Sequence, residues 1–145
     1  MAENIKILKG YSNGTLELSD NGHTKAKKGK GIKWKIKDQS DANSIKVVSI
    51  ESIYLKSTSG NIFSVRPYRD GDKWKAEIDE SASTNAESEY AIRWQDPEGN
   101  VRTHDPKISV LPSDSFFNIP NTIIVLLISL VSGLFLLKFF HKRRK

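Results

Sequence analysis

Hydrophobic and polar side chains alternate in three short stretches of the chain, residues 31–37, 73–79 and 89–95. A period of two is typical of a β-strand with one face buried and the other in water. Each stretch carries one tryptophan on its hydrophobic side. The pattern therefore predicts three strands that share a core containing the following aromatic side chains: Trp34, Trp74, Trp94 and Tyr90.

Weaker alternation between the N-terminus and residue 112 predicts further short strands. These cover residues 5–8, 15–19, 45–50, 52–56, 62–66 and 107–111. Turn sequences rich in Asn, Asp and Gly separate them. No window of 11 or more residues in this region has the apolar spacing of a helix. Seven to nine short strands in about 110 residues predict an all-β domain over residues 1–112, folded as a Greek-key β-sandwich.

The chain changes character after residue 119. Residues 122–137 are all apolar, small or hydroxyl-bearing, and with Phe139 and Phe140 they reach the roughly 20 residues that span a bilayer as a helix. We therefore expect a linker at residues 113–119, a single transmembrane helix at 120–140 and a basic tail at 141–145. The apolar side chains expected to anchor the helix include Ile123, Leu126, Leu130, Leu134 and Leu137.

The net charge of +6 divides unevenly along the chain. Residues 1–118 carry 18 Lys and Arg against 17 Asp and Glu, which gives 18 − 17 = +1. The other five charges are all basic and are expected at the membrane interface: Lys138, Lys142, Arg143, Arg144 and Lys145. The basic excess thus belongs to the membrane segment, and nucleic acid is not an expected partner.

Two rules disagree about the orientation of the membrane segment. The positive-inside rule places the basic tail in the cytoplasm and the domain outside. However, residues 1–10 lack the apolar stretch of a signal peptide, and a helix so near the C-terminus resembles a tail anchor. We expect a single-pass membrane protein with a cytosolic domain, and the extracytoplasmic domain is the alternative.

Small residues on the predicted helix suggest a route to self-association. Ser129 and Gly133 are four residues apart and Ser132 lies beside them, a spacing that allows two helices to approach closely. The same residues are also ordinary in isolated membrane helices. Homo-oligomerisation through this face is therefore an alternative to a monomeric anchor.

Four segments together resemble a small cupredoxin-like or immunoglobulin-like domain. They are Gly-Thr-Leu-Glu-Leu-Ser-Asp at 14–20, Lys-Lys-Gly-Lys-Gly-Ile-Lys-Trp-Lys-Ile at 27–36, Tyr-Ala-Ile-Arg-Trp at 90–94 and Asp-Pro-Lys-Ile-Ser-Val at 105–110. The resemblance implies a sandwich fold over roughly residues 10–112. It does not extend to a blue-copper site, which needs two His and a Cys thiolate, because the chain has no cysteine.

Two histidines are the candidate metal ligands of the sequence. His23 and His104 are the only histidines before the tail, and His104 is expected in the loop between the last two strands. We expect no cofactor.

A run of lysines is a candidate patch for an anionic partner, such as lipid headgroups or a phosphorylated protein. The alternative is that these lysines form the solvent-exposed face of a strand and protect its edge against aggregation. The run comprises Lys25, Lys27, Lys28, Lys30, Lys33, Lys35 and Lys37.

Catalytic motifs are absent from the sequence: it has no cysteine nucleophile and no Gly-x-Ser-x-Gly elbow. The leading hypothesis is a membrane-tethered, non-enzymatic binding or adaptor module that presents a β-sandwich to a protein partner. One alternative is a membrane-acting effector or channel component that oligomerises through its helix. A third is an exported cupredoxin-like metal-binding protein with altered ligands.

Overall fold

The computed structural model describes residues 2–56 and 60–113, which form strands and turns without any α-helix. The all-β prediction is therefore confirmed for this part of the chain. The predicted transmembrane helix, the basic tail and all but the first residue of the predicted linker lie outside the described residues.

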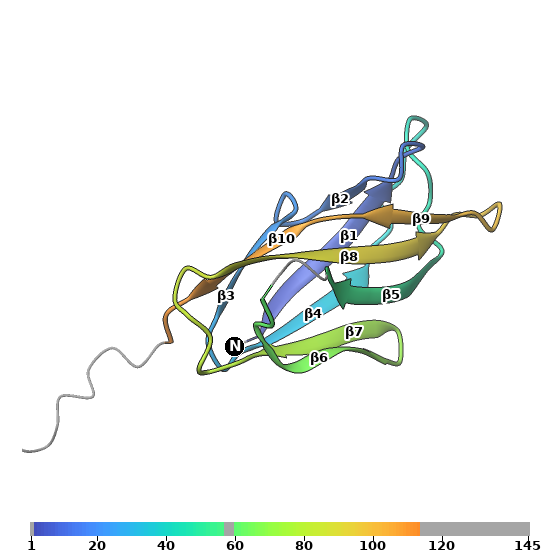
Figure 1. The fold of residues 1–145 in the computed structure, drawn as a ribbon. Helices are drawn as coiled ribbons and strands as arrows, with labels where there is room; N and C mark the ends of the chain where they lie inside the picture. The colour runs from blue at the N-terminus through green and yellow to red at the C-terminus, as the bar shows by residue number, and fades with distance from the viewer. Residues whose placement is uncertain (1, 57–59, 114–145) are drawn as a thin grey trace, which may run out of the picture. The chain divides into compact units, whose positions relative to one another are not determined.

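Ten strands follow one another along the described residues, and Figure 1 shows their arrangement. Their bounds are β1 (Glu3–Gly10), β2 (Leu16–Leu18), β3 (His23–Lys27), β4 (Gly31–Ile36), β5 (Ser49–Leu55), β6 (Phe63–Asp70), β7 (Lys73–Ile78), β8 (Glu87–Gln95), β9 (Val101–His104) and β10 (Lys107–Leu111).

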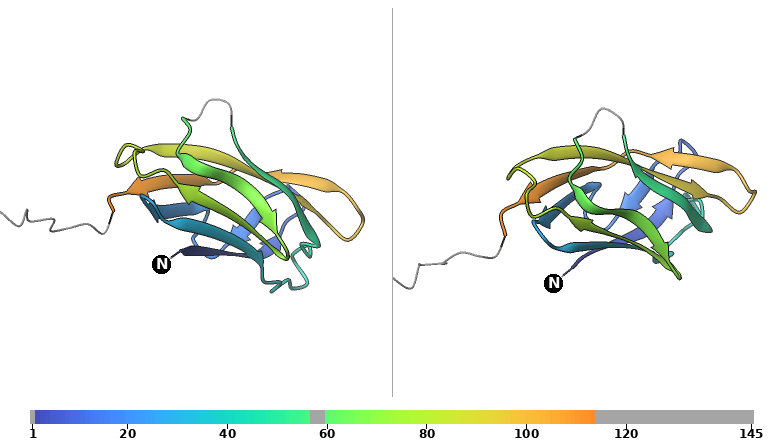
Figure 2. Two further views of the ribbon diagram at one scale, coloured as in Figure 1. Left: turned by 90° about the horizontal axis from the view of Figure 1, so that it is seen from below. Right: turned by 60° about the horizontal axis from the view of Figure 1, so that its bottom comes forward.

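The strands form two mixed sheets, an arrangement compatible with a β-sandwich. The first sheet has the order β2-β1-β4-β7-β6, and the second has the order β3-β10-β8-β5, with β9 also paired to β8. Most neighbours are antiparallel, but β1 runs parallel to β4 and β10 runs parallel to β3. Figure 2 shows the two sheets from two further directions. Strands β5 and β6 are each the last strand of their sheet.

One hydrophobic cluster takes side chains from both sheets. Trp34 on β4 and Tyr90 on β8 are completely buried, with ring centroids 5.7 Å apart, and the Trp34 Nε1–H donates to the Tyr90 Oη at 3.2 Å. Trp94 is also completely buried, whereas Trp74 is only partly buried and packs against the cluster. The inner faces of the two sheets are therefore joined by apolar contact and by a hydrogen bond between aromatic side chains.

Two strands were not predicted, and one predicted strand is largely irregular. Strand β3 buries only Thr24 and Ala26, which give no hydrophobic alternation, and its pairing with the distant β10 holds it in place. Strand β9 has four residues, Val-Arg-Thr-His, and forms by hairpin pairing with β8. Between residues 45 and 48, Ile45 makes an isolated bridge to Gly10, and the regular strand begins only at Ser49.

Candidate functional site

The two histidines considered as metal ligands lie on different faces of the second sheet. His104 is on β9 and not in a loop, which corrects the sequence expectation; it is paired with the buried Ile92 and is itself half-buried. His23 begins β3 on the exposed face, opposite in direction to Thr24. Across residues 2–56 and 60–113, no group of three or more His, Asp or Glu side chains is placed to hold a metal ion.

The His104 imidazole has an unusual environment. Its Nε2 is buried and has no hydrogen-bond partner among the described residues. Burial lowers the pKa of His104, although the nearby Asp105 and Asp20 carboxylates oppose that shift. Burial therefore disfavours the charged ring, which contributes packing beneath the turn that contains Gly22.

A cluster of Ser109, His23 and Glu87 on the outer face of the second sheet was not anticipated from the sequence, because the three residues come from three different strands. The His23 Nε2 lies 2.6 Å from the Ser109 Oγ and 3.9 Å from a Glu87 carboxylate oxygen. Both partners therefore face the same ring nitrogen. A hydrolase triad needs the carboxylate on the opposite nitrogen to orient the imidazole, so this cluster does not have that geometry.

The lysines of the candidate patch are divided between the two sheets. Lys25 and Lys27 belong to β3 in the second sheet, and Lys33 and Lys35 point outward from β4 in the first. Lys28 and Lys30 lie in the turn between these strands, and Lys37 follows β4. The connection between these strands therefore carries the run from the second sheet to the first.

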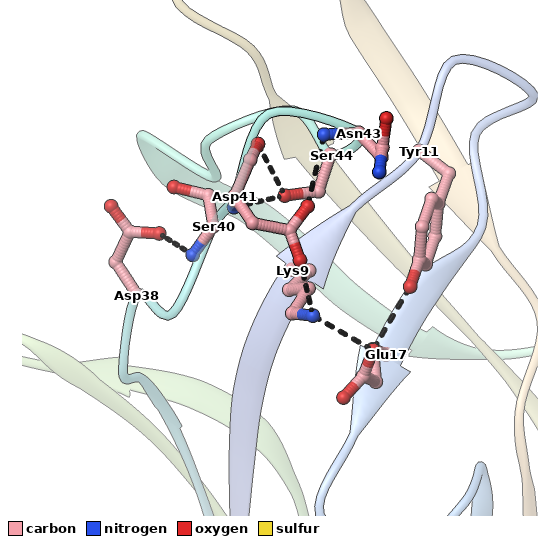
Figure 3. A network of polar contacts seen from close by, with 8 residues as sticks. All are labelled: Lys9, Tyr11, Glu17, Asp38, Ser40, Asp41, Asn43 and Ser44. Atoms are coloured by element: carbon pink, nitrogen blue, oxygen red, sulfur yellow. Dashed lines mark hydrogen bonds and ion pairs between the residues drawn. The ribbon is translucent and has the colours of Figure 1, made fainter.

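A polar network joins the end of β1 to the loop that follows β4 (Figure 3). The Lys9 Nζ lies 2.8 Å from an Asp41 carboxylate oxygen and 3.8 Å from Glu17, and the Tyr11 hydroxyl donates to Glu17 at 2.9 Å. Asp41 also caps its own loop by accepting from the Asn43 backbone N–H at 3.0 Å. The network fastens the loop to the sheet.

The pKa shifts in this network are those expected of ion pairs with a structural role. The hydrogen bond to Asp41 raises the pKa of Lys9, and the bond from Lys9 lowers the pKa of Asp41. The hydrogen bond to Glu17 raises the pKa of Tyr11. A general base or a nucleophilic lysine requires shifts in the other direction, toward an uncharged lysine or a protonated carboxylate near neutral pH.

A second network at the β8–β9 hairpin holds a buried carboxylate. Asp96 is 1% exposed and accepts from the Arg102 Nε at 2.9 Å and from the Asn100 backbone N–H at 2.8 Å. Burial acts to raise the pKa of Asp96, but the hydrogen bonds from Asn100 and Arg102 outweigh it and the pKa is lowered. The Arg102 guanidinium also lies over the Trp94 ring, 5.9 Å from its centroid. This network fixes the turn.

A groove of about 400 Å³ lies between the edge strands β5 and β6. Its walls combine apolar, neutral polar and cationic side chains: Ile53, Tyr54, Leu55, Lys56, Asn61, Arg66 and Pro67. Tyr54 is 44% exposed although it is a large aromatic residue. Sequence reasoning missed this groove because neither strand has an unusual sequence; the groove exists because both strands end their sheets on the same side of the core.

The two edge strands differ in how far they are protected. Strand β6 contains Pro67 and two irregularities in its pairing with β7, features that hinder the addition of another strand. Strand β5 is irregular only between Ile50 and Ser52 and then pairs regularly with β8 up to Leu55. In the described chain β5 is paired on one side only, so its other backbone edge faces the groove region.

The predicted anchor, helix-packing and interface residues lie outside the described part of the chain. None of the described residues forms a helix long and apolar enough to cross a membrane. A comparison with protein-family models and a search of curated proteins each found no match to this chain.

Proposed function

We propose that the protein is a membrane-tethered, non-enzymatic binding module, and that its domain belongs to the cupredoxin-like or immunoglobulin-like Greek-key sandwiches. The observation that carries the binding role is the groove between β5 and β6, where an exposed tyrosine stands beside the less protected sheet edge. In this proposal the groove receives an extended segment of a protein partner.

An extended peptide suits this surface for two reasons. A free strand edge supplies backbone N–H and C=O groups to a new strand, and a neighbouring groove selects side chains, as in β-augmentation. Arg66 has no ion-pair partner among the described residues, whereas Lys56 is engaged by Asp105 at 2.7 Å. The preferred segment therefore carries an apolar or aromatic side chain for Tyr54 and an acidic one for Arg66.

The ionisable groups support a binding role over an enzymatic one. Where a pKa is shifted among the described Asp and Glu side chains it is lowered, and among the described lysines it is raised. Hydrogen bonds and opposite charges cause these shifts. They stabilise the charged forms, which favours ion pairing and not proton transfer.

The membrane role rests on the sequence of residues 120–140, whose length and hydropathy suit a transmembrane helix. We infer that the domain faces the cytosol. The tether would concentrate the domain at one membrane, where even a weak peptide interaction gains from the raised effective concentration.

The groove is tested by site-specific photocrosslinking with the full chain in native membranes. A photoreactive phenylalanine replaces Tyr54, and the same residue replaces Glu98 in the β8–β9 turn as the control. We expect a discrete crosslinked adduct from position 54 that is weakened severalfold by Arg66→Glu. The control variant Val101→Ala shortens an exposed hydrophobic side chain outside the groove lining and should leave the adduct unchanged.

Two results would contradict the groove proposal. One is the absence of any adduct at position 54 beyond the level seen at position 98. The other is an adduct that Val101→Ala and Arg66→Glu reduce equally, since that pattern indicates contact with the general surface.

A further inference from the structure

Five lysines point outward from three adjacent strands of the first sheet. Lys6 is on β1, Lys33 and Lys35 are on β4, and Lys73 and Lys75 are on β7. Their strand neighbours on the inner face, such as Ile5, Ile32 and Ala76, are buried. We call these five residues the lysine face. Figure 1 shows β1, β4 and β7 side by side in the sheet.

The register of the sheet puts like charges opposite one another on this face. Lys6 pairs with Lys35, and Lys35 pairs with Lys73, which makes one row of three lysines that ends at Asp70 on β6. Lys33 pairs with Lys75 in the adjacent row. Like charges directly opposite each other on neighbouring strands destabilise a sheet.

Acidic residues neutralise only part of the lysine face. Lys35 is 2.7 Å from Asp72, and Lys75 forms an ion pair with Asp70. Lys6 and Lys33 have no ion-pair partner among the described residues, whereas Lys73 lies opposite Asp70 in the sheet and interacts electrostatically with Asp70 and Asp72. A hollow of about 600 Å³ lies over these side chains and is lined by Asn4, Ile5, Lys6, Lys33, Lys35 and Lys73. It is large enough to admit a phosphate-bearing headgroup.

The outer face of the second sheet is arranged differently. Lys107 on β10 is 2.9 Å from Glu87 on β8, and Lys56 lies 3.6 Å from Glu89. Basic and acidic side chains therefore alternate across these strands. Because residues 1–118 together carry only +1, the unneutralised lysines of the first sheet give the domain one basic side and not a uniformly basic surface.

We propose that the lysine face lies on the anionic headgroups of the membrane that tethers the protein. This inference rests on the proposed tether: the seven residues 113–119 reach at most about 25 Å when fully extended, which keeps the domain near the bilayer. Lysines close to an anionic leaflet are attracted to it within roughly one Debye length, about 10 Å at 0.1 M salt. A multistrand sheet face offers several ammonium groups to such a surface at once.

The edge of the lysine face adds an amphipathic side chain. The row containing Lys33 and Lys75 continues to Tyr68 on β6, which is 47% exposed. Tyrosine is favoured at membrane interfaces because its ring is apolar and its hydroxyl is polar. In the proposed contact with the membrane, Tyr68 thus adds an apolar ring and a hydroxyl group to the charges of the lysines.

The test compares lysine acetylation rates in the full chain reconstituted in phosphatidylcholine vesicles, with and without phosphatidylserine. Mass spectrometry reports the rate at each lysine. We expect Lys6, Lys33 and Lys73 to react severalfold more slowly when phosphatidylserine is present, and Lys25 and Lys107 on the second sheet to be unchanged. High salt should abolish the difference, because screening is stronger there.

Charge-neutralised variants provide a second measurement. Energy transfer from the domain tryptophans to a headgroup-labelled lipid should rise with phosphatidylserine in the parent chain. The rise should disappear in a variant carrying Lys6→Gln, Lys33→Gln and Lys73→Gln. A matched variant carrying Lys25→Gln, Lys46→Gln and Lys107→Gln loses the same charge elsewhere and should behave as the parent does.

The possible outcomes distinguish a failure of the lysine-face inference from a failure of the proposed membrane tether. A chain that does not float with phosphatidylcholine vesicles contradicts the tether, and this inference fails with it. A chain that floats with both kinds of vesicle but shows equal acetylation at all lysines overturns the lysine-face inference alone. Protection that requires an added phosphorylated protein, with none from phosphatidylserine, also overturns it.

Discussion

The indole ring of Trp94 is held on three sides by backbone and side-chain groups. Its Nε1–H donates to the Gly14 carbonyl oxygen at 3.0 Å, and the Arg102 guanidinium lies over the ring. Gly10 presses against the ring edge: a Cβ at this position would lie 2.4 Å from the nearest ring carbon. The close approach explains why β1 ends in a glycine at this point.

Gly10→Ala should therefore destabilise the domain. The added methyl group cannot fit without displacing a buried ring, and overpacking of this kind costs about 1–3 kcal/mol. Denaturant unfolding of the full chain in detergent, followed by tryptophan fluorescence, measures the loss. Gly60→Ala is the control, because a Cβ at Gly60 has no neighbour within 4 Å. Equal stability of the two variants would contradict the packing described for Trp94.

Tyr90 links the two sheets through its hydroxyl, and its environment predicts a pH dependence. Burial raises the pKa of Tyr90 to about 12, although hydrogen bonds with Thr24 and Trp34 act in the other direction. In the unfolded chain the phenol releases its proton near pH 10. The stability contributed by this shift is thus complete below about pH 10 and is lost as the pH rises to about 12.

Tyr90→Phe should reveal both effects. At neutral pH the variant leaves the Trp34 Nε1–H buried without a partner and should lose about 1–3 kcal/mol of unfolding free energy. Between pH 10 and 12 the parent should lose stability more steeply than the variant, because only the parent carries the titrating phenol. Unfolding free energies measured across this range provide the test. Parallel pH profiles would contradict the assignment.

At the scale of the strands, the sequence was informative where one face is strongly apolar. In β4 and β8 the buried positions are occupied by Ile32, Trp34, Tyr90 and Trp94, and the alternation is unmistakable. Strand β3 could not be recognised in the same way, because its buried positions are Thr24 and Ala26 and its partner β10 lies about 80 residues away in sequence.

The candidate sites depended on pairings that no local pattern encodes. The lysine run was visible, but its division between two sheets follows from the crossing of the chain between β3 and β4. The lysine face instead includes Lys6 from β1 and Lys73 from β7, because the sheet register places both of them opposite Lys35. The groove likewise follows from the positions of β5 and β6 as edge strands, which only the complete topology defines.

Sheet register also predicts an opposition between stability and membrane contact. Lys33→Glu would replace the Lys33–Lys75 pair by an oppositely charged cross-strand pair, so thermal unfolding should occur a few degrees higher. The same substitution should weaken the contact with phosphatidylserine vesicles. Circular dichroism and the energy-transfer measurement report the two effects. A variant that is destabilised in detergent would contradict the proposed repulsion on the lysine face.

At the scale of the whole molecule, we propose two binding surfaces with separate roles. The groove between β5 and β6 receives a protein segment, and the lysine face contacts lipid. They use different side chains: the groove relies on Tyr54 and Arg66, and the face relies on Lys6, Lys33 and Lys73. Variants in one surface should therefore leave the other interaction intact.

The central claim, a domain tethered by a helix at residues 120–140 and facing the cytosol, is tested most directly by glycosylation mapping. Asn13-Gly14-Thr15 is a sequon, and Asn13 is exposed. A second sequon is appended beyond Lys145 through a flexible spacer, and the full chain is made with glycosylating microsomes. We predict glycan at the appended sequon and none at Asn13, with Asn13→Gln as the control. Modification at Asn13, or at neither site, would contradict the account.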